Sequence, residues 1–194
     1  MKLVSALMIG GLAAFLASCA SISREECVEG DWYGIGERDG RSGHVADSRF
    51  ARHKDACARV DIRPDRSQWD RGYEAGLAHY CTPQSGLREG RAGRSYRGVC
   101  PAATEPRFMQ GHSLGMAENR QRERIRRTDR EIRQLTAQNR ELRGQLDDHD
   151  DSRDLRRQLR NNRAELTRLR VDLRLARSAL IAAERESRSF LAGL

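Results

Sequence analysis

Hydrophobic residues follow three different patterns along the 194 residues of the chain. Residues 3–15 form one short apolar run, residues 27–116 combine scattered apolar side chains with most of the glycines, and residues 117–194 carry regularly spaced aliphatic side chains in a charged background. These patterns predict a mainly α-helical protein. We expect a leader over residues 1–18, a short tether over 19–26, a small glycine-rich head cross-linked by disulfides over 27–116, and a long antiparallel helical hairpin over 117–194.

The regular pattern of the C-terminal part is a heptad repeat in two frames. The first frame contains Ile125, Ile132, Asn139 and Leu146, with Leu135 and Leu142 on the neighbouring position. The second frame contains Leu159, Leu166, Leu173 and Leu180, with Leu155, Leu169 and Ala176 beside it. Seven-residue spacing is typical of a coiled coil, and a polar Asn139 in the seam can fix its register. The two frames are out of phase, so the pattern predicts an interruption between them.

The interruption lies between Gly144 and Asp154. A glycine followed by several aspartates and Ser152 indicates the end of one helix, a turn, and the N-cap of the next helix. We therefore expect two long arms that pack as an antiparallel coiled coil. The alternative is one bent, continuous coiled coil that dimerises.

The head contains an internal repeat of an aromatic residue, two residues, a glycine, three residues and a second glycine. The copies are Tyr33-Gly36-Gly40, Trp69-Gly72-Gly76 and Phe108-Gly111-Gly115, with a damaged copy at Gly86-Gly90-Gly93. Glycines four residues apart lie on one helical face, and each costs a helix interior about 1 kcal/mol relative to alanine. The repeat therefore predicts close helix–helix approach. A phosphate-binding loop is the competing interpretation, but the copies lack a Gly-Lys-Ser/Thr ending and a preceding strand.

The apolar run at the start of the chain is too short to span a bilayer. It follows Lys2 and ends in Leu16-Ala17-Ser18-Cys19, which resembles the bacterial lipobox. The resemblance implies a signal peptide cleaved before Cys19, a diacylglycerol thioether on its sulfur, and acylation of its amine by a fatty acid such as palmitate. Three chains would anchor the protein permanently. Ala20 stands where an aspartate typically retains lipoproteins at the inner membrane, so we expect the periplasmic face of a Gram-negative outer membrane.

Four further cysteines remain for disulfide bonds in that oxidising compartment: Cys27, Cys57, Cys81 and Cys100. Four cysteines allow three connectivities. We favour Cys27–Cys57 with Cys81–Cys100, because sequential closure requires no threading of the chain.

The head resembles a family of bacterial lipoproteins known only as a domain of unknown function (family 2799). The residues that carry this resemblance are Cys27, Asp31-Trp32, Ile35-Gly36, Asp39-Gly40, Gly43, His53, Cys57, Gly72-Tyr73, Gly76-Leu77, Tyr80-Cys81-Thr82-Pro83, Gly86, Gly90, Gly93, Tyr96, Gly98-Val99-Cys100-Pro101, Phe108 and Gly111. Trp69 stands where the family has a tyrosine, so the ring character is kept. The family has no established activity, and the resemblance implies location and fold more than function.

Charge separates the tail from the head. Residues 20–116 have a net charge of +1 and residues 117–194 a net charge of +6, and all 36 basic residues except Lys2 and Lys54 are arginines. Secretion argues against nucleic acid as the partner. The anions of the envelope are lipid head groups, lipopolysaccharide phosphates and peptidoglycan carboxylates, which arginines can bind with salt-sensitive affinity.

Little in the head predicts catalysis. His53 and Cys57, or His79 and Cys81, do not have a recognised zinc spacing, and disulfides compete for the thiols. Asp31, Asp39 and Asp65 could supply paired carboxylates for glycan hydrolysis, but the sequence does not determine their separation. We therefore expect no enzyme, no metal and no cofactor.

The sequence favours a lipid-anchored envelope protein with a structural or adaptor role. Its expected partners are the membrane, through the lipid, and a protein or a second copy of the chain, through the coiled coil. An anionic envelope component is a further candidate. One alternative is a glycan- or lipid-binding module whose ligand-facing residues are Trp32, Asp39, His53, Trp69 and Tyr80. The other is an envelope hydrolase.

Overall fold

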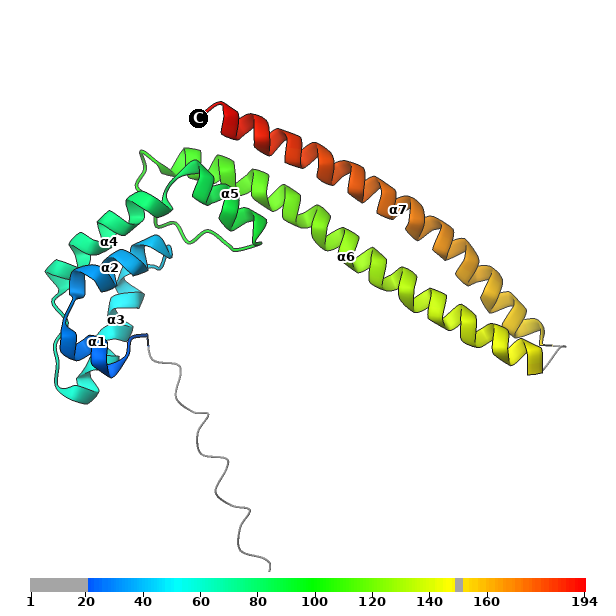
Figure 1. Cartoon of the computed structure of the whole chain (residues 1–194), viewed down its shortest axis with the longest axis horizontal. Helices are drawn as coiled ribbons and strands as arrows, with labels where there is room; N and C mark the ends of the chain where they lie inside the picture. The colour runs from blue at the N-terminus through cyan, green and yellow to red at the C-terminus, as the bar shows by residue number, and fades with distance from the viewer. Residues whose placement is uncertain (1–20, 149–151) are drawn as a thin grey trace, which may run out of the picture. The chain divides into compact units, whose positions relative to one another are not determined.

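The computed structural model describes residues 21–148 and 152–194, and this part of the chain is helical without any strand (Figure 1). Its elements are α1 (Arg24–Glu29), α2 (Trp32–Arg41), α3 (Ala46–Cys57), the 3₁₀ helix η1 (Ala58–Val60), α4 (Arg66–Tyr80), α5 (Pro83–Arg91), α6 (Glu105–Asp148) and α7 (Arg153–Ala192). Two disulfides, Cys27–Cys57 and Cys81–Cys100, have the sequential pairing that the spacing favours. The prediction of a mainly helical, disulfide-bonded protein is confirmed.

The chain divides into two compact units whose boundary differs from the predicted one. The first unit extends to Tyr80 and includes Arg97–Val99, and the second contains Cys81–Tyr96 and Cys100–Leu194. The glycine-rich region 27–116 is therefore split between the units. The physical reason is that its helices pack in two separate pairs, α2 with α4 and α5 with α6.

The predicted tether is partly folded. Ser23 begins α1 with a capping box, in which its hydroxyl accepts from the Glu26 backbone N–H and the Glu26 carboxylate accepts from the Ser23 N–H. Ile22 is buried, and Cys27 in α1 is bonded to Cys57 at the end of α3. A reciprocal cap satisfies two backbone donors that would otherwise require water. The segment from residue 21 onward is thus part of the first unit.

Glycines bring the backbones of α2 and α4 into direct contact. A Cβ atom added to Gly36 would lie 2.1 Å from the Trp69 carbonyl oxygen, and one added to Gly76 would lie 2.2 Å from the Glu37 carbonyl oxygen. Such distances are far below any normal contact, so no other residue fits without a shift of the backbone. The sequence prediction of close helix approach holds for this pair.

The α5–α6 pair repeats this arrangement. A Cβ on Gly86 would lie 2.1 Å from the Phe108 carbonyl oxygen, and one on Gly115 would lie 2.3 Å from the Leu87 carbonyl oxygen. Gly86-Gly90-Gly93 is therefore not a damaged copy of the aromatic–glycine motif. It is the counterpart of Gly36-Gly40-Gly43, and each of these segments packs on one aromatic–glycine segment.

The α2–α4 and α5–α6 pairs also share equivalent contacts outside the glycines. Tyr73 Oη donates to the His44 carbonyl at 2.5 Å in the first pair, and His112 Nε2 donates to the Arg94 carbonyl at 2.7 Å in the second. Tyr73 and His112 each lie four residues after the aromatic residue of their motif, and each acceptor carbonyl follows a glycine with positive φ. We interpret this correspondence as an internal duplication.

Helices α6 and α7 pack against each other side by side (Figure 1). Arg122 contacts Glu184 and Asn139 contacts Asn162, so the two helices run in opposite directions. Buried aliphatic residues lie between them: Leu142, Leu159, Leu166, Leu169, Leu173 and Ala176. Ser152 caps α7 as predicted, whereas Gly144 lies inside α6 rather than at its end.

Candidate functional site

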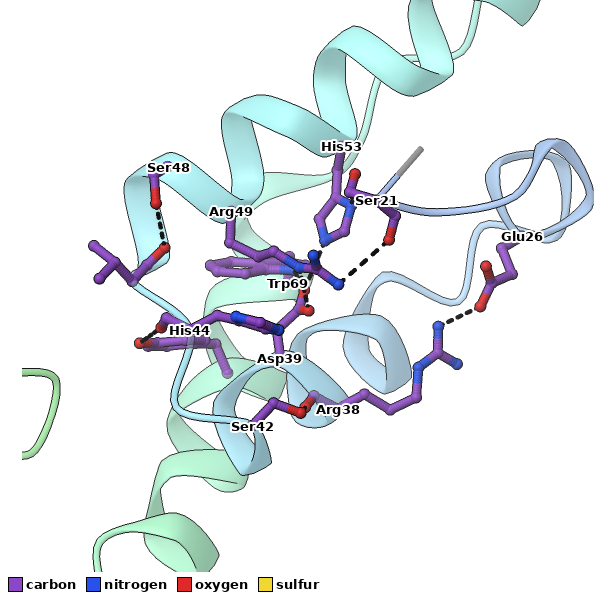
Figure 2. Close-up of polar contacts among 12 residues, drawn as sticks. Ser21, Glu26, Arg38, Asp39, Ser42, His44, Ser48, Arg49, His53 and Trp69 are labelled. Atoms are coloured by element: carbon purple, nitrogen blue, oxygen red, sulfur yellow. Dashed lines mark hydrogen bonds and ion pairs between the residues drawn. The ribbon is translucent and has the colours of Figure 1, made fainter. Parts of the chain in front are cut away.

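The candidate site is a buried polar cluster in the first unit, shown in Figure 2. Helix α2 supplies Asp39, α3 supplies Arg49 and His53 from one face, one turn apart, and α4 supplies Trp69. Ser21, the first described residue, reaches the cluster from the N-terminal segment. Four separate parts of the chain therefore meet at these five side chains.

Asp39 is the centre of the cluster. One carboxylate oxygen accepts from His53 Nε2 at 2.6 Å and from Trp69 Nε1 at 3.1 Å, and the other accepts from Arg49 Nε at 2.6 Å. Asp39 is only 3% exposed. Burial raises the pKa of Asp39, but hydrogen bonds and positive charge from His53 and Arg49 outweigh burial and hold this pKa below its ordinary value.

His53 connects Asp39 to the N-terminal segment. Its Nδ1 lies 2.8 Å from Ser21 Oγ, and the ring is 1% exposed. Because an ionised carboxylate can only accept, Nε2 carries the proton, and in the neutral ring Nδ1 accepts from the Ser21 hydroxyl. Arg49 Nη2 also donates to the Ser21 carbonyl at 3.3 Å. Ser21 is thus held by two residues of α3.

The residue order, serine to histidine to aspartate, is that of Ser-His-Asp hydrolases, but the two imidazole nitrogens are exchanged: Nδ1 faces the serine and Nε2 faces the aspartate. In such a triad the aspartate orients the imidazole, which accepts the serine proton. Here the aspartate also neutralises Arg49 and accepts from Trp69, which makes it the common anchor of α2, α3 and α4. The arrangement can therefore either fix Ser21 in place or activate its hydroxyl.

The five residues predicted to face a ligand are all buried, which corrects that prediction. Trp32, Trp69 and Tyr80 are 5%, 0% and 5% exposed, respectively. Trp69 stacks on Tyr73 with ring centroids 4.9 Å apart, and the Tyr80 ring packs against Gly43. The rings fill the space beside the glycine contacts of α2 and α4 rather than a binding face. Exposed aromatic rings were the basis of the glycan- or lipid-binding interpretation, and that basis is removed.

Most of the other residues considered for hydrolysis or metal binding have structural contacts instead. Asp31 and Asp65 accept from the backbone N–H groups of Gly34 and Gln68, so each carboxylate stabilises the start of a helix. Cys57 and Cys81, which the sequence does not favour as zinc ligands, form disulfides. Within the described residues no three His, Cys, Asp or Glu side chains form a metal-sized group. Asp39 alone of the three predicted carboxylates belongs to the cluster.

Two members of the cluster, Ser21 and Arg49, did not emerge from the sequence. Arg49 has a local signal, because it precedes His53 by four residues and so lies on the same helical face. Ser21 has no such signal, since 32 residues separate it from His53. Only the packing of α1 and its preceding segment on α3 brings them together.

A second buried carboxylate joins three helices of the second unit. Both oxygens of Glu118 in α6 accept from Arg91 of α5, at 2.8 and 2.9 Å, and one also accepts from Arg122, which in turn pairs with Glu184 of α7. Burial raises the pKa of Glu118, but Arg91 and Arg122 lower it below its ordinary value. This network stabilises the packing of α5, α6 and α7.

The fold and site define a mainly helical, disulfide-bonded protein built on paired glycine-rich helices. Residues 31–117 match the model of a family described as Protein of unknown function (DUF2799), which confirms the family resemblance for that segment. No curated protein and no solved structure matches the chain. In residues 21–148 and 152–194, no helix is long and apolar enough to cross a bilayer.

Proposed function

We propose that the protein is a lipid-anchored envelope protein with a structural or adaptor role, attached through Cys19 at the periplasmic face of the outer membrane. Cys19 lies outside the described residues. The observation that carries the proposal is the attachment of Ser21 to His53 and Arg49, two residues beyond the lipobox cysteine. A chain fixed so soon after its lipid would hold the first unit against the membrane surface.

The packing of the N-terminal segment supports this role. Ile22 is buried and α1 is joined to α3 by the Cys27–Cys57 disulfide. A flexible tether would allow the folded part to move over tens of ångströms, whereas this segment leaves only Cys19 and Ala20 between the lipid and the fold. Such rigidity is useful to a protein that must present a surface in a defined place.

Helices α6 and α7 are the proposed interaction element. Their heptad seams pack together as an antiparallel coiled coil, and at 1.5 Å per residue each helix is about 60 Å long. Most of their exterior is charged and solvent-exposed. We propose that this pair contacts a protein partner or a second copy of the chain.

Lipidation is tested by feeding cells an alkyne analogue of palmitate and detecting its attachment to the protein. We expect labelling and outer-membrane fractionation of the natural chain, and loss of both for Cys19→Ser. Ser18→Ala, which keeps a small residue before the cysteine, is the matched control and should remain labelled. Equal labelling of natural and C19S protein would refute the anchor.

The adaptor role is tested by photocrosslinking from exposed positions Gln138 and Arg163, with the adducts identified by mass spectrometry. A probe at exposed Gln68 in the first unit is the control. Adducts with one protein from α6 and α7, absent from the control, would establish an adaptor, and adducts only with the same chain would establish a self-associated structural protein. Absence of protein adducts from both helical positions would refute an interaction through this pair.

A second candidate function, an envelope hydrolase, is favoured by the Ser21–His53–Asp39 contacts. In this hypothesis Ser21 Oγ attacks an acyl carbon while His53 Nδ1 takes its proton, and His53 returns that proton to the leaving group as its bond to the acyl carbon breaks. A fluorophosphonate probe should then label Ser21, and the label should persist in Ser48→Ala but disappear in Ser21→Ala. Lack of labelling in the natural protein would exclude a serine activated in this way.

A further inference from the structure

One edge of the α6–α7 pair carries an excess of positive charge. Seven arginines, which we call the basic edge, are all exposed, and none forms an ion pair with another described side chain. They are Arg133, Arg140 and Arg143 on α6, and Arg160, Arg163, Arg170 and Arg174 on α7.

Two ion pairs establish which residues face each other along this edge. Arg122 pairs with Glu184 at 2.9 Å, and Asp129, seven residues further along α6, pairs with Arg177, seven residues earlier in α7, at 3.9 Å. Two more steps of seven residues in opposite directions place Thr136 across from Arg170 and Arg143 across from Arg163. Opposite charges therefore no longer face each other beyond Asp129 and Arg177. At the last step two arginines, Arg143 and Arg163, face each other across the seam.

The remaining arginines widen the same edge. On a helix, residues three and four positions away from an edge position lie beside it. Arg133 and Arg140 flank Thr136 on α6, while Arg160 and Arg174 extend the row of Arg163 and Arg170 on α7. Thr167, Arg170, Leu173 and Arg174 also line a shallow hollow on α7. The seven arginines thus lie along one edge of the pair, and part of this edge is slightly concave.

The opposite edge of the α6–α7 pair carries a different set of charged residues, so the positive charge is not evenly distributed around the pair. Arg124 lies 3.5 Å from Asp172 there, and the same seven-residue steps place Glu131 across from Glu165. The next step places Gln138 across from Gln158. The opposite edge therefore mixes charges of both signs, and its arginines Arg124 and Arg168 pair with Asp172 and Glu165. The seven arginines of the basic edge form no such pairs with described side chains.

We propose that the basic edge binds the phosphate groups of an anionic lipid surface. Guanidinium groups bind phosphate through two parallel hydrogen bonds and lose hydration more easily than ammonium groups. Seven residues of helix rise about 10 Å, so successive arginines would meet an array of anions rather than one small ion. An anion array would also relieve the repulsion between Arg143 and Arg163. The choice of a lipid surface rests on the proposed envelope location.

The test measures binding to lipid vesicles of residues 20–194, the chain without its leader and its lipidated cysteine, which keeps every described residue. Vesicles of phosphatidylglycerol mixed with phosphatidylcholine should bind it, with affinity that falls as salt increases, and vesicles of phosphatidylcholine alone should not. The triple variant R143Q/R163Q/R170Q should bind on the order of a hundred-fold more weakly. The matched control R120Q/R127Q/R185Q removes the same charge from exposed positions elsewhere on α6 and α7, and should bind almost normally.

Three outcomes would overturn the proposal. Equal loss of binding in both triple variants would mean that net charge, not the basic edge, is responsible. Binding of polyglutamate as tight as binding of the anionic vesicles would identify carboxylates as the partner. Absence of binding to anionic vesicles by the natural chain would exclude a lipid surface. The palmitate experiment is independent. Absence of labelling of the natural chain would refute the anchor and leave the vesicle result unchanged, and absence of vesicle binding would leave the labelling result unchanged.

Discussion

His53 Nε2 and Asp39 Oδ2 lie 2.6 Å apart, and both side chains are almost completely buried. A buried carboxylate is tolerated only when its oxygens are paired, and here they also accept from Arg49 and Trp69. The cluster therefore makes the packing of α2, α3 and α4 depend on one charged residue.

Asp39→Asn should destabilise the first unit by about 3 kcal/mol, because it leaves Arg49 without its buried partner. Urea unfolding followed by the fluorescence of Trp32 and Trp69, both of which are buried in the first unit, measures the change. Asp55→Asn, an exposed aspartate on α3, is the matched control and should change the free energy of unfolding by less than about 0.5 kcal/mol. An equal effect of the two variants would mean that the cluster contributes nothing specific.

The lowered pKa of Asp39 predicts loss of stability in acid. A carboxyl group whose pKa is lower in the folded state than in the unfolded state stabilises the fold above its unfolded pKa of about 3.9. That contribution disappears as the pH falls from about 4 through the lowered pKa of the folded state. Urea unfolding over this acid range should show that the free energy of unfolding declines more for the natural chain than for D39N. Equal declines would contradict the attribution of this acid sensitivity to Asp39.

Ser21→Ala should free the N-terminal segment without unfolding the first unit. It removes one hydrogen bond, which contributes about 1 kcal/mol, while the Cys27–Cys57 disulfide still holds α1. Hydrogen exchange should accelerate at Ile22 and in α1 but not in α4. Unchanged exchange around Ile22 would show that the contact with His53 does not hold the segment.

Alanine substitutions at glycines should destabilise the protein at some positions and stabilise it at others. Gly36→Ala and Gly115→Ala place a Cβ 2.1 and 2.3 Å from backbone oxygens, so each should destabilise its unit by about 3 kcal/mol or more. Gly144 lies inside α6 with nothing within 4 Å of such a Cβ, and Gly144→Ala should stabilise the second unit by about 1 kcal/mol. Thermal unfolding measures all three, and a stabilising Gly36→Ala would disprove the tight contact.

Each disulfide should contribute about 3–4 kcal/mol, because the bonds join residues separated by 30 and 19 positions. Cys81→Ser or Cys100→Ser should therefore lower the melting temperature of the second unit sharply, and a reductant should then have no further effect on that unit. If melting of both variants matched that of the oxidised natural chain, the bond would not form in the protein.

Local chemistry in the sequence was sufficient for several features. Helical periodicity predicted the helices, glycines four apart predicted close approach, and Ser152 predicted the start of α7, because each depends on residues within one or two turns. The preferred disulfide pairing also agrees with the structure. Local patterns were not sufficient to show that Gly36-Gly40-Gly43 and Gly86-Gly90-Gly93 are counterparts in a duplicated helix pair.

Other features became known only from the tertiary structure, because they depend on packing between segments that are distant in the sequence. It placed the predicted aromatic residues inside, because the glycines let α2 and α4 approach closely and the rings pack beside that contact. It divided the glycine-rich region between two units, because each helix pair closes its own contact. It also joined Ser21 to His53 and placed Arg143 across from Arg163. These relations depend on how distant helices are aligned, and no single segment of the sequence contains that information.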